Sequence, residues 1–208
     1  MFPRIISTIL ISWVLFCSLT AAQPLDTLWT LSLGGTGSDA GYCVQQTSDR
    51  GFIAIGHLDY HQICLIKTDA LGRVQWNHVY GNYTYGLHGD FVQQTSDNGY
   101  IMVGGAEGGV IDILLIKTDS LGAEEWNSPL FGTPPYNHAY CVRQTLDGGY
   151  IVTGYAISWS YPFTREILLL VKTNGLGIVE WERQYPQLIK GTEVLQADDG
   201  GYIESVDL

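Results

Sequence analysis

Histidine, acidic and aromatic side chains gather in the segments that connect the predicted β-strands of this 208-residue sequence. Imidazole and carboxylate groups can hydrogen-bond a ligand, and aromatic rings can lie against sugar faces or peptide side chains. Rigid scaffolds usually build their binding sites on such connections. We therefore expect one ligand-binding face, formed by His57, Asp59, Tyr60, His61, Tyr83, Tyr85, His88, Tyr136, His138, Trp159, Tyr161 and Phe163.

The same segments carry no specific signature of catalysis or metal binding. His57 and His61 are four residues apart in a predicted loop, and the spacing fixes no third metal ligand. Nothing resembles a nucleophile elbow, a phosphate loop or a dinucleotide fingerprint. We expect no catalytic residue, metal or cofactor. Four carboxylates are available for glycoside cleavage, but no spacing singles out a pair: Asp59, Asp90, Glu107 and Asp112.

An internal repeat predicts the elements that position these residues. One motif occurs four times, with its glutamines 48, 50 and 52 residues apart: Gln46-Thr-Ser-Asp-Arg-Gly-Phe, Gln94-Thr-Ser-Asp-Asn-Gly-Tyr, Gln144-Thr-Leu-Asp-Gly-Gly-Tyr and Gln196-Ala-Asp-Asp-Gly-Gly-Tyr. A second motif precedes Trp76, Trp126 and Trp181: Leu65-Ile-Lys-Thr-Asp-Ala-Leu-Gly, Leu115-Ile-Lys-Thr-Asp-Ser-Leu-Gly and Leu170-Val-Lys-Thr-Asn-Gly-Leu-Gly. Periods of about 40–50 residues built of short β segments are typical of propeller blades or related stacked arrays.

Each repeat predicts four antiparallel strands, which we call A to D. Strand A alternates in polarity and reverses at a turn such as Asp49-Arg-Gly, and strand C is almost continuously apolar, as in Ile113-Leu-Leu-Ile. A tight turn such as Asp69-Ala-Leu-Gly then leads to strand D with its tryptophan. The A–B and C–D turns keep their length, whereas the B–C and D–A connections vary. The two sets emerge on opposite faces of a four-stranded meander, which predicts one uniform face and one diversified face.

The predicted fold is an all-β propeller of four-stranded antiparallel blades. Three complete units cover approximately residues 41–88, 89–138 and 139–190, a partial unit covers 191–208, and the segment 28–35 matches a strand D. The partial unit lacks strand C, which predicts an exposed edge and an uncovered sheet face. We expect a truncated or partial gene product. A compact four-bladed ring with one defective blade is the alternative.

The pattern Lys-Thr-Asp-x-x-Gly-x-x-x-Trp followed by Gln-Thr-x-Asp-Gly-Gly-Tyr-Ile resembles the tandem repeats of secreted propeller-like proteins of prokaryotes. The resemblance covers nearly the whole mature chain. Asp69, Gly72 and Trp76 are also similar to the tryptophan-docking motif of quinoprotein dehydrogenase propellers, with an Asp-to-Gly spacing one residue shorter. The resemblance implies a propeller fold. It implies little about activity, because propellers host hydrolases, dehydrogenases, lectins and pure scaffolds.

Residues that recur at the same phase serve what every unit needs, so we expect structural roles for them. The aspartates of the A–B turns belong to hairpins rather than to calcium sites: Asp49, Asp97, Asp147 and Asp199. The indoles pack between units rather than on a ligand: Trp29, Trp76, Trp126 and Trp181. The lysines at the end of strand C pair with a carboxylate or extend to water: Lys67, Lys117 and Lys172.

The first residues predict export. Arg4 precedes an apolar run over 5–19 that ends in small residues, which is typical of a signal peptide over 1–22, with 23–208 as the mature domain. A membrane anchor is the alternative, but the run is shorter than the roughly 20 residues that span a bilayer. The mature cysteines match no zinc site, and we expect them as unbonded core residues: Cys43, Cys64 and Cys141.

The formal net charge of -11, with only 10 Lys and Arg residues, argues against a nucleic acid or an anionic membrane surface as the partner. We expect a secreted protein that acts outside the cell, in the periplasm or at the cell surface. The expected function is a noncatalytic propeller scaffold that binds a glycan or an extracellular protein. The alternative is a noncatalytic or incomplete part of an exported enzyme, either a glycoside-acting hydrolase or a quinoprotein-like oxidoreductase.

Overall fold

The computed structural model describes residues 30, 32, 34, 36–59, 62–81, 87–106, 113–130, 137–160, 163–186 and 190–207. For 87, 106, 158–160, 163–165 and 207 it describes the backbone only. The chain divides into two units, residues 1–30 and 31–208, and the description below concerns the second. The predicted signal peptide and most of the predicted strand over 28–35 lie outside the described residues.

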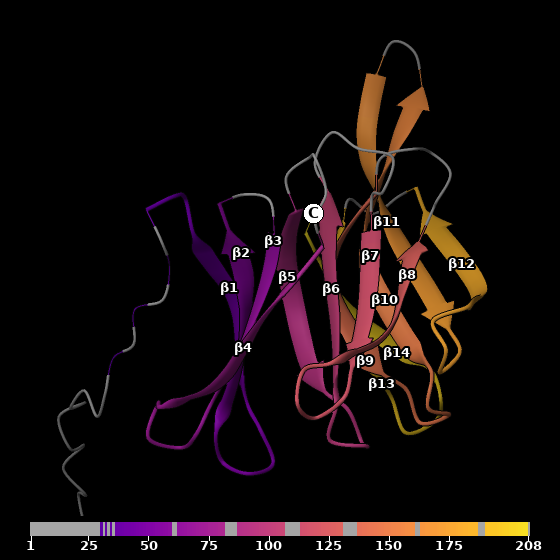
Figure 1. Cartoon of the computed structure of the whole chain (residues 1–208). Coiled ribbons are helices and arrows are strands. Elements are labelled where there is room, and N and C mark those ends of the chain that lie inside the picture. The colour runs from indigo at the N-terminus through magenta and orange to yellow at the C-terminus, as the bar shows by residue number, and fades with distance from the viewer. Residues whose placement is uncertain are drawn as a thin grey trace, which may run out of the picture. The chain divides into compact units, whose positions relative to one another are not determined.

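The described residues form β-strands and short turns with no helix, which confirms the all-β prediction. No helix among them is therefore long and apolar enough to cross a membrane. Three antiparallel sheets of four strands are followed by a two-stranded sheet, and within each sheet the strands pair in chain order (Figure 1). The strands are β1 (Ala40–Gln46), β2 (Phe52–Leu58), β3 (Gln62–Thr68), β4 (Val74–Tyr80), β5 (Leu87–Gln94), β6 (Tyr100–Ala106), β7 (Ile113–Thr118), β8 (Glu124–Leu130), β9 (Asn137–Gln144), β10 (Tyr150–Ser160), β11 (Phe163–Thr173), β12 (Val179–Tyr185), β13 (Lys190–Gln196) and β14 (Tyr202–Asp207).

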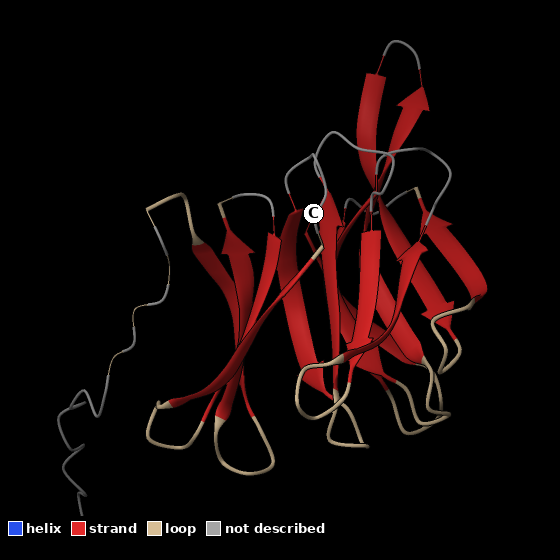
Figure 2. Cartoon of the chain, in the orientation of Figure 1, coloured by secondary structure: helices blue, strands red, loops and turns tan. Residues whose placement is uncertain are grey.

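The short turns lie at one end of the sheets, drawn in tan toward the lower edge of Figure 2. In the turn between β3 and β4, the carboxylate of Asp69 accepts hydrogen bonds from the backbone N–H groups of Leu71 and Arg73 at 2.8 and 2.9 Å. Asn174 accepts the equivalent pair through its side-chain oxygen. Only an acceptor oxygen is needed here, which explains why Asp and Asn both occur at this repeat position.

The hydrophobic core lies between successive sheets. In each strand A a valine faces the sheet before it, and in each strand B an isoleucine faces the sheet after it. These residues are fully buried and share one core cluster per interface: Val92 with Ile53, Val142 with Ile101, and Val194 with Ile151. The same two positions are exposed on the outer faces of the first and last sheets, where Val44 and Ile203 are each 65% accessible. A sheet of this protein therefore hides its apolar faces by stacking on its neighbours.

Three of the four recurring tryptophans pack between units, as predicted, and the fourth, Trp29, lies outside the described residues. Each indole on a strand D lies against the tyrosine that begins strand B of the next unit, with ring centroids 5.7–5.8 Å apart and the planes inclined by 59–67°. Such edge-to-face pairs add to the burial of apolar surface. The pairs are Trp76 with Tyr100, Trp126 with Tyr150, and Trp181 with Tyr202.

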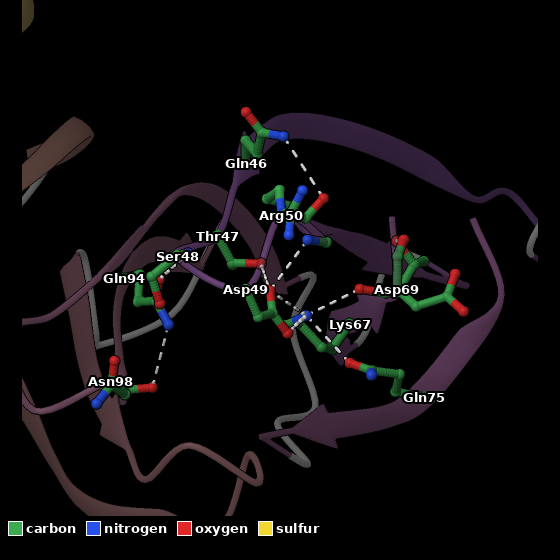
Figure 3. A network of polar contacts seen from close by, with 12 residues as sticks. Gln46, Thr47, Ser48, Asp49, Arg50, Lys67, Asp69, Gln75, Gln94 and Asn98 are labelled. Atoms are coloured by element: carbon green, nitrogen blue, oxygen red, sulfur yellow. Dashed lines mark hydrogen bonds and ion pairs between the residues drawn. The ribbon is translucent and has the colours of Figure 1, made fainter. Parts of the chain in front are cut away.

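The glutamine that marks each repeat joins one unit to the next. The side-chain oxygen of Gln94 accepts a 2.8 Å hydrogen bond from the backbone N–H of Ser48, in the turn of the preceding unit (Figure 3). Two further glutamines make the same bond at 2.8 Å: Gln144 with Ser96, and Gln196 with Leu146. These bonds give the glutamine a structural reason to recur.

The recurring lysine is buried and paired, which confirms the expected partnership with a carboxylate. The ammonium of Lys67 lies 2.8 Å from Asp49 and also donates to Gln75 and to the backbone oxygen of Thr68 (Figure 3). Equivalent networks in the next two units add a glutamate: Lys117 with Asp97 and Glu125, and Lys172 with Asp147 and Glu180. The turn aspartate therefore neutralises a buried charge and holds the A–B turn against strand C.

These contacts lower the pKa of the turn carboxyls. The hydrogen bond from Lys67 is the main reason why the pKa of Asp49 falls from 3.8 to about 2. Burial opposes the shift at Asp97, but hydrogen bonds from Thr95 and Lys117 outweigh it, so this pKa also falls to about 2. A depressed pKa stabilises the fold above the ordinary value of the carboxyl, and the stabilisation is lost as the pH falls through about 2.

We expect the melting temperature to fall steeply between about pH 4 and pH 2, because three such carboxyls must be protonated there. Asp147, whose pKa is lowered to about 2 by Thr145 and its other donors, is the third. Asp97→Asn removes one of the three titrations. The variant should lose about 1 kcal/mol at neutral pH, since Asp97 is 56% exposed and solvent screens its ion pair. Thermal melts at several pH values should show a shallower acid dependence for the variant, and identical slopes would contradict this account.

The three cysteines among the described residues are unbonded, as expected. Cys64 and Cys141 are buried, and Cys43 is partly buried. Cys43 and Cys64 lie on β1 and β3, with β2 between them.

Candidate functional site

Four of the twelve residues expected to bind a ligand have described side chains: His57, Asp59, His88 and His138. Tyr60, His61, Tyr83, Tyr85, Tyr136 and Tyr161 lie outside the described residues, as do the candidate carboxylates Glu107 and Asp112. For Trp159 and Phe163 only the backbone is described.

The expected loop positions need correction. His57, His88 and His138 lie in strands β2, β5 and β9 rather than in loops. Trp159 and Phe163 also lie in strands, because β10 and β11 each run for 11 residues and pair up to Ser160 and Phe163. This hairpin extends beyond its neighbours at the top of Figure 1. The sequence offers no proline or glycine between 155 and 161 to end β10 earlier.

A β-bulge near the start of every strand A shapes the site. The register with strand B shifts by one residue in β1, β5, β9 and β13, which leaves Tyr42, Asp90, Tyr140 and Thr192 as the extra residues. A bulge re-aims the side chain that it carries. The bulged residue thus leaves the alternation of the strand, at the end of the sheet opposite to the short turns.

The bulges and their neighbours line up across the units, because β1 contacts β5, β5 contacts β9, and β9 contacts β13. His88, His138 and Lys190 occupy one repeat position, two residues before the bulge. We call the resulting continuous set of side chains the first-strand row. Its members on strands A are Tyr42, His88, Asp90, His138, Tyr140 and Lys190. Two further members, His57 and Tyr155, lie on the adjoining strands β2 and β10.

Ring contacts run along the first-strand row. The centroid of the Tyr42 ring lies 5.5 Å from that of His57 and 6.3 Å from that of His88. His138 stacks on His88 at 4.9 Å and on Tyr155 at 5.6 Å, with planes inclined by 23° and 3°. The units are therefore connected at this end of the sheets by aromatic and imidazole rings.

Polar contacts continue the row at both ends. The hydroxyl of Tyr42 lies 3.3 Å from Nδ1 of His57. At the other end, the ammonium of Lys190 lies 5.4 Å from the centroid of the Tyr140 ring, which is a cation–π distance. The row thus offers ring faces together with groups that can donate or accept hydrogen bonds.

The centre of the row is a histidine–aspartate–histidine cluster. Asp90 Oδ2 lies 2.9 Å from Nδ1 of His88, and Asp90 Oδ1 lies 3.8 Å from Nε2 of His138. One ligand atom from each residue can be chosen so that all three lie within 4.8 Å of one another. The side chains are 12–19% exposed, so the cluster is shielded but within reach of solvent.

Asp59 lies apart from this centre. It occupies the turn after β2 with a φ of 52°, and its N–H donates a 3.2 Å hydrogen bond to Asp39. Together with His57, both aspartates line a hollow on the first sheet that also includes Cys64 and Asn77. His57 is therefore shared by the row and the hollow.

Sequence reasoning missed Tyr42, Tyr140, Tyr155 and Lys190. A signal was present, because a glycine recurs near the end of strand B at Gly56, Gly104 and Gly154. A side chain at Gly104 or Gly154 would collide with a strand A carbonyl, of His88 or His138 respectively. A glycine at this repeat position of strand B indicates that the backbone of strand A lies very close, and the bulge of strand A lies next to that point.

Comparison with known proteins adds nothing to this picture. No model of a known protein family matches the chain, and a search of curated proteins finds no relative. The described residues form an all-β repeat structure that carries the first-strand row.

Proposed function

We propose that the protein is a secreted, noncatalytic scaffold of the β-propeller type that binds a glycan through the first-strand row. The first strands of successive sheets pack side by side, as the inner strands of propeller blades do. The proposed secretion rests on the predicted signal peptide. The observation that carries the proposed function is the separation of roles. Residues of constant type join the units, whereas the row is built on positions whose residue type varies along the chain, such as the one that holds Ala40, His88, His138 and Lys190.

The chemistry of the row favours a sugar. Ring faces such as those of Tyr42 and Tyr140 can cover the apolar faces of a pyranose, while Asp90 and Lys190 can hydrogen-bond its hydroxyls. Tyr42 is 52% exposed, so its ring is accessible without rearrangement. The rings are anchored on strands, which reduces the loss of conformational entropy on binding.

A glycan array followed by titration calorimetry tests this proposal. We expect selective binding, and we expect Tyr42→Ala to weaken it by about tenfold, because one stacked ring contributes about 1.4 kcal/mol. Tyr140→Phe keeps the ring and should retain most of the affinity.

His78→Ala is the matched control. His78 is an exposed ring on the outer strand β4, where it bonds the carbonyl of Leu121, and its loss should leave glycan affinity unchanged. Turnover of a polysaccharide, or the absorbance of a bound quinone, would contradict the proposed scaffold function and indicate an exported enzyme. Binding of a protein instead of any glycan, lost in Tyr42→Ala, would keep the surface but change its ligand class.

A further inference from the structure

We propose that His88, Asp90 and His138 form a binding site for a zinc-like divalent transition-metal ion. The contacts from Asp90 to the two imidazoles are 2.9 and 3.8 Å, and one ligand atom from each residue lies within 4.8 Å of the others. Tetrahedral zinc with ligands at about 2.0–2.1 Å separates neighbouring ligand atoms by about 3.3 Å. The 2.9 and 3.8 Å contacts are made by different oxygens of Asp90. With one ligand atom per residue the three atoms lie within 4.8 Å of one another, so side-chain rotation must bring them closer together to bind the ion.

The backbone explains why these groups meet. His88 and His138 occupy the same repeat position on β5 and β9, and these strands pack against each other. Asp90 is the bulged residue of β5, and the bulge turns its carboxylate toward both imidazoles. Metal ligands held by three strand positions need little ordering when the ion binds.

No spacing in the sequence marks this cluster, because its two histidines are 50 residues apart and belong to different sheets. We expected no metal site because the histidines that are close in sequence, His57 and His61, have no third ligand at a fixed spacing. The equivalent positions in the first unit are Ala40 and Tyr42, so the ligand set is not part of the repeat. Among the described residues a single pair of neighbouring units carries this cluster, so the stability of the repeat does not require it.

The donor set selects the class of ion. Two imidazoles and one carboxylate suit zinc and similar divalent transition metals, whereas calcium and magnesium prefer oxygen ligands alone. Two neutral imidazoles and one carboxylate have a net charge of -1, and binding of a dication changes the net charge of the site to +1. Three protein ligands leave at least one coordination position for water or for a bound molecule, as in open zinc sites. The site does not depend on the proposed glycan, and the metal alone is its probe.

Zinc titration of the purified full chain, stripped of metal with EDTA, tests the proposal. We expect one Zn²⁺ per chain and a rise in melting temperature of about 5–10 °C when the metal is about 100 times above its dissociation constant. Asp90→Asn and His138→Gln should each weaken binding by more than about 100-fold, the upper figure for loss of an outer-sphere partner. Mg²⁺ should produce neither effect.

His78→Gln is the control, because it removes an exposed imidazole from β4 and leaves the cluster intact. It should bind zinc like the unaltered chain. If a ligand variant fails to fold, imidazole proton spectra of the unaltered chain decide, since only five histidines are present and two should respond to one equivalent of zinc. Zinc uptake equal in the unaltered chain and Asp90→Asn, or no uptake at all, overturns the site. Glycan binding without zinc binding would leave the proposed function standing.

Discussion

Gly104→Ala is expected to destabilise the protein by about 3 kcal/mol, at the upper end of what overpacking usually costs. Gly104 faces the backbone of the neighbouring strand A. A Cβ there would lie well inside contact distance of the carbonyl oxygen of His88 and 3.1 Å from Cα of Gly89. Backbone atoms on paired strands cannot rotate away as a side chain does, so β5 and β6 would have to separate.

The bulge makes this position sensitive. β6 is held between β5 and β7, so it cannot move away from β5 without weakening its other pairing. Val206 takes the equivalent place in the last unit, where β14 pairs only with β13 and has no third strand to confine it. The presence or absence of a third strand therefore explains both why valine is accepted at position 206 and why alanine should be destabilising at position 104.

Gly41→Ala is the control for Gly104→Ala. A Cβ at Gly41 would meet nothing within 4 Å, and the equivalent residue of the third unit is already Ala139. Alanine in a strand is favoured over glycine by about 0.5–1 kcal/mol, so the control should melt at or slightly above the temperature of the unaltered chain. Gly104→Ala should melt about 6–12 °C lower. Equal melting of the two variants would show that β5 and β6 do not approach as closely as described.

The sequence was sufficient to predict the strands and the short turns. Local signals specify them: the apolar run at Ile113–Ile116, the turn at Asp69–Gly72, and the spacing between repeats. Because each of these elements recurs, an error in one unit is exposed by the others. The roles of the recurring lysine, aspartate and tryptophan followed from the same comparison between units.

The geometry of the candidate site could not be predicted in the same way. His88 and His138 meet through the packing of two sheets, and no local pattern reports which side chains of β5 and β9 face each other. The bulges at Asp90 and Tyr140 change the direction of those side chains, so a strict alternation along strand A would misplace them. The length of the β10–β11 hairpin was missed because cross-strand pairing, rather than a turn residue, decides where it ends.

A division of labour follows from the contacts between units. Gln94 and Trp76 make contacts between neighbouring units, and Lys67 makes an ion pair within its own unit. Equivalent residues of other units make the same contacts. Ligand binding needs a surface on which the units differ, and the first-strand row meets this need because alanine, histidine and lysine share one repeat position. The framework can therefore stay constant while the row changes.

Ile101→Ala should cost about 2–5 kcal/mol, whereas Ile203→Ala should cost less than about 0.5 kcal/mol, although both isoleucines hold the same repeat position. Ile101 is fully buried between the second and third sheets, and Ile203 is 65% exposed on the last sheet. Residue type and register with strand A are alike in β6 and β14. In the part of the chain that the structure describes, Ile203 has no following sheet to cover it, and β14 also lacks the third strand that β7 provides for β6.

Urea denaturation of both variants measures this difference directly. A large loss only for Ile101→Ala is the result expected if stacking between units supplies the hydrophobic stabilisation, as in a repeat array. Comparable losses would mean that each sheet is stabilised from within, or that the exposed face of β14 is covered in solution. In either case the interfaces between units, and with them the alignment of β5 beside β9 that creates the histidine cluster, would need a different physical explanation.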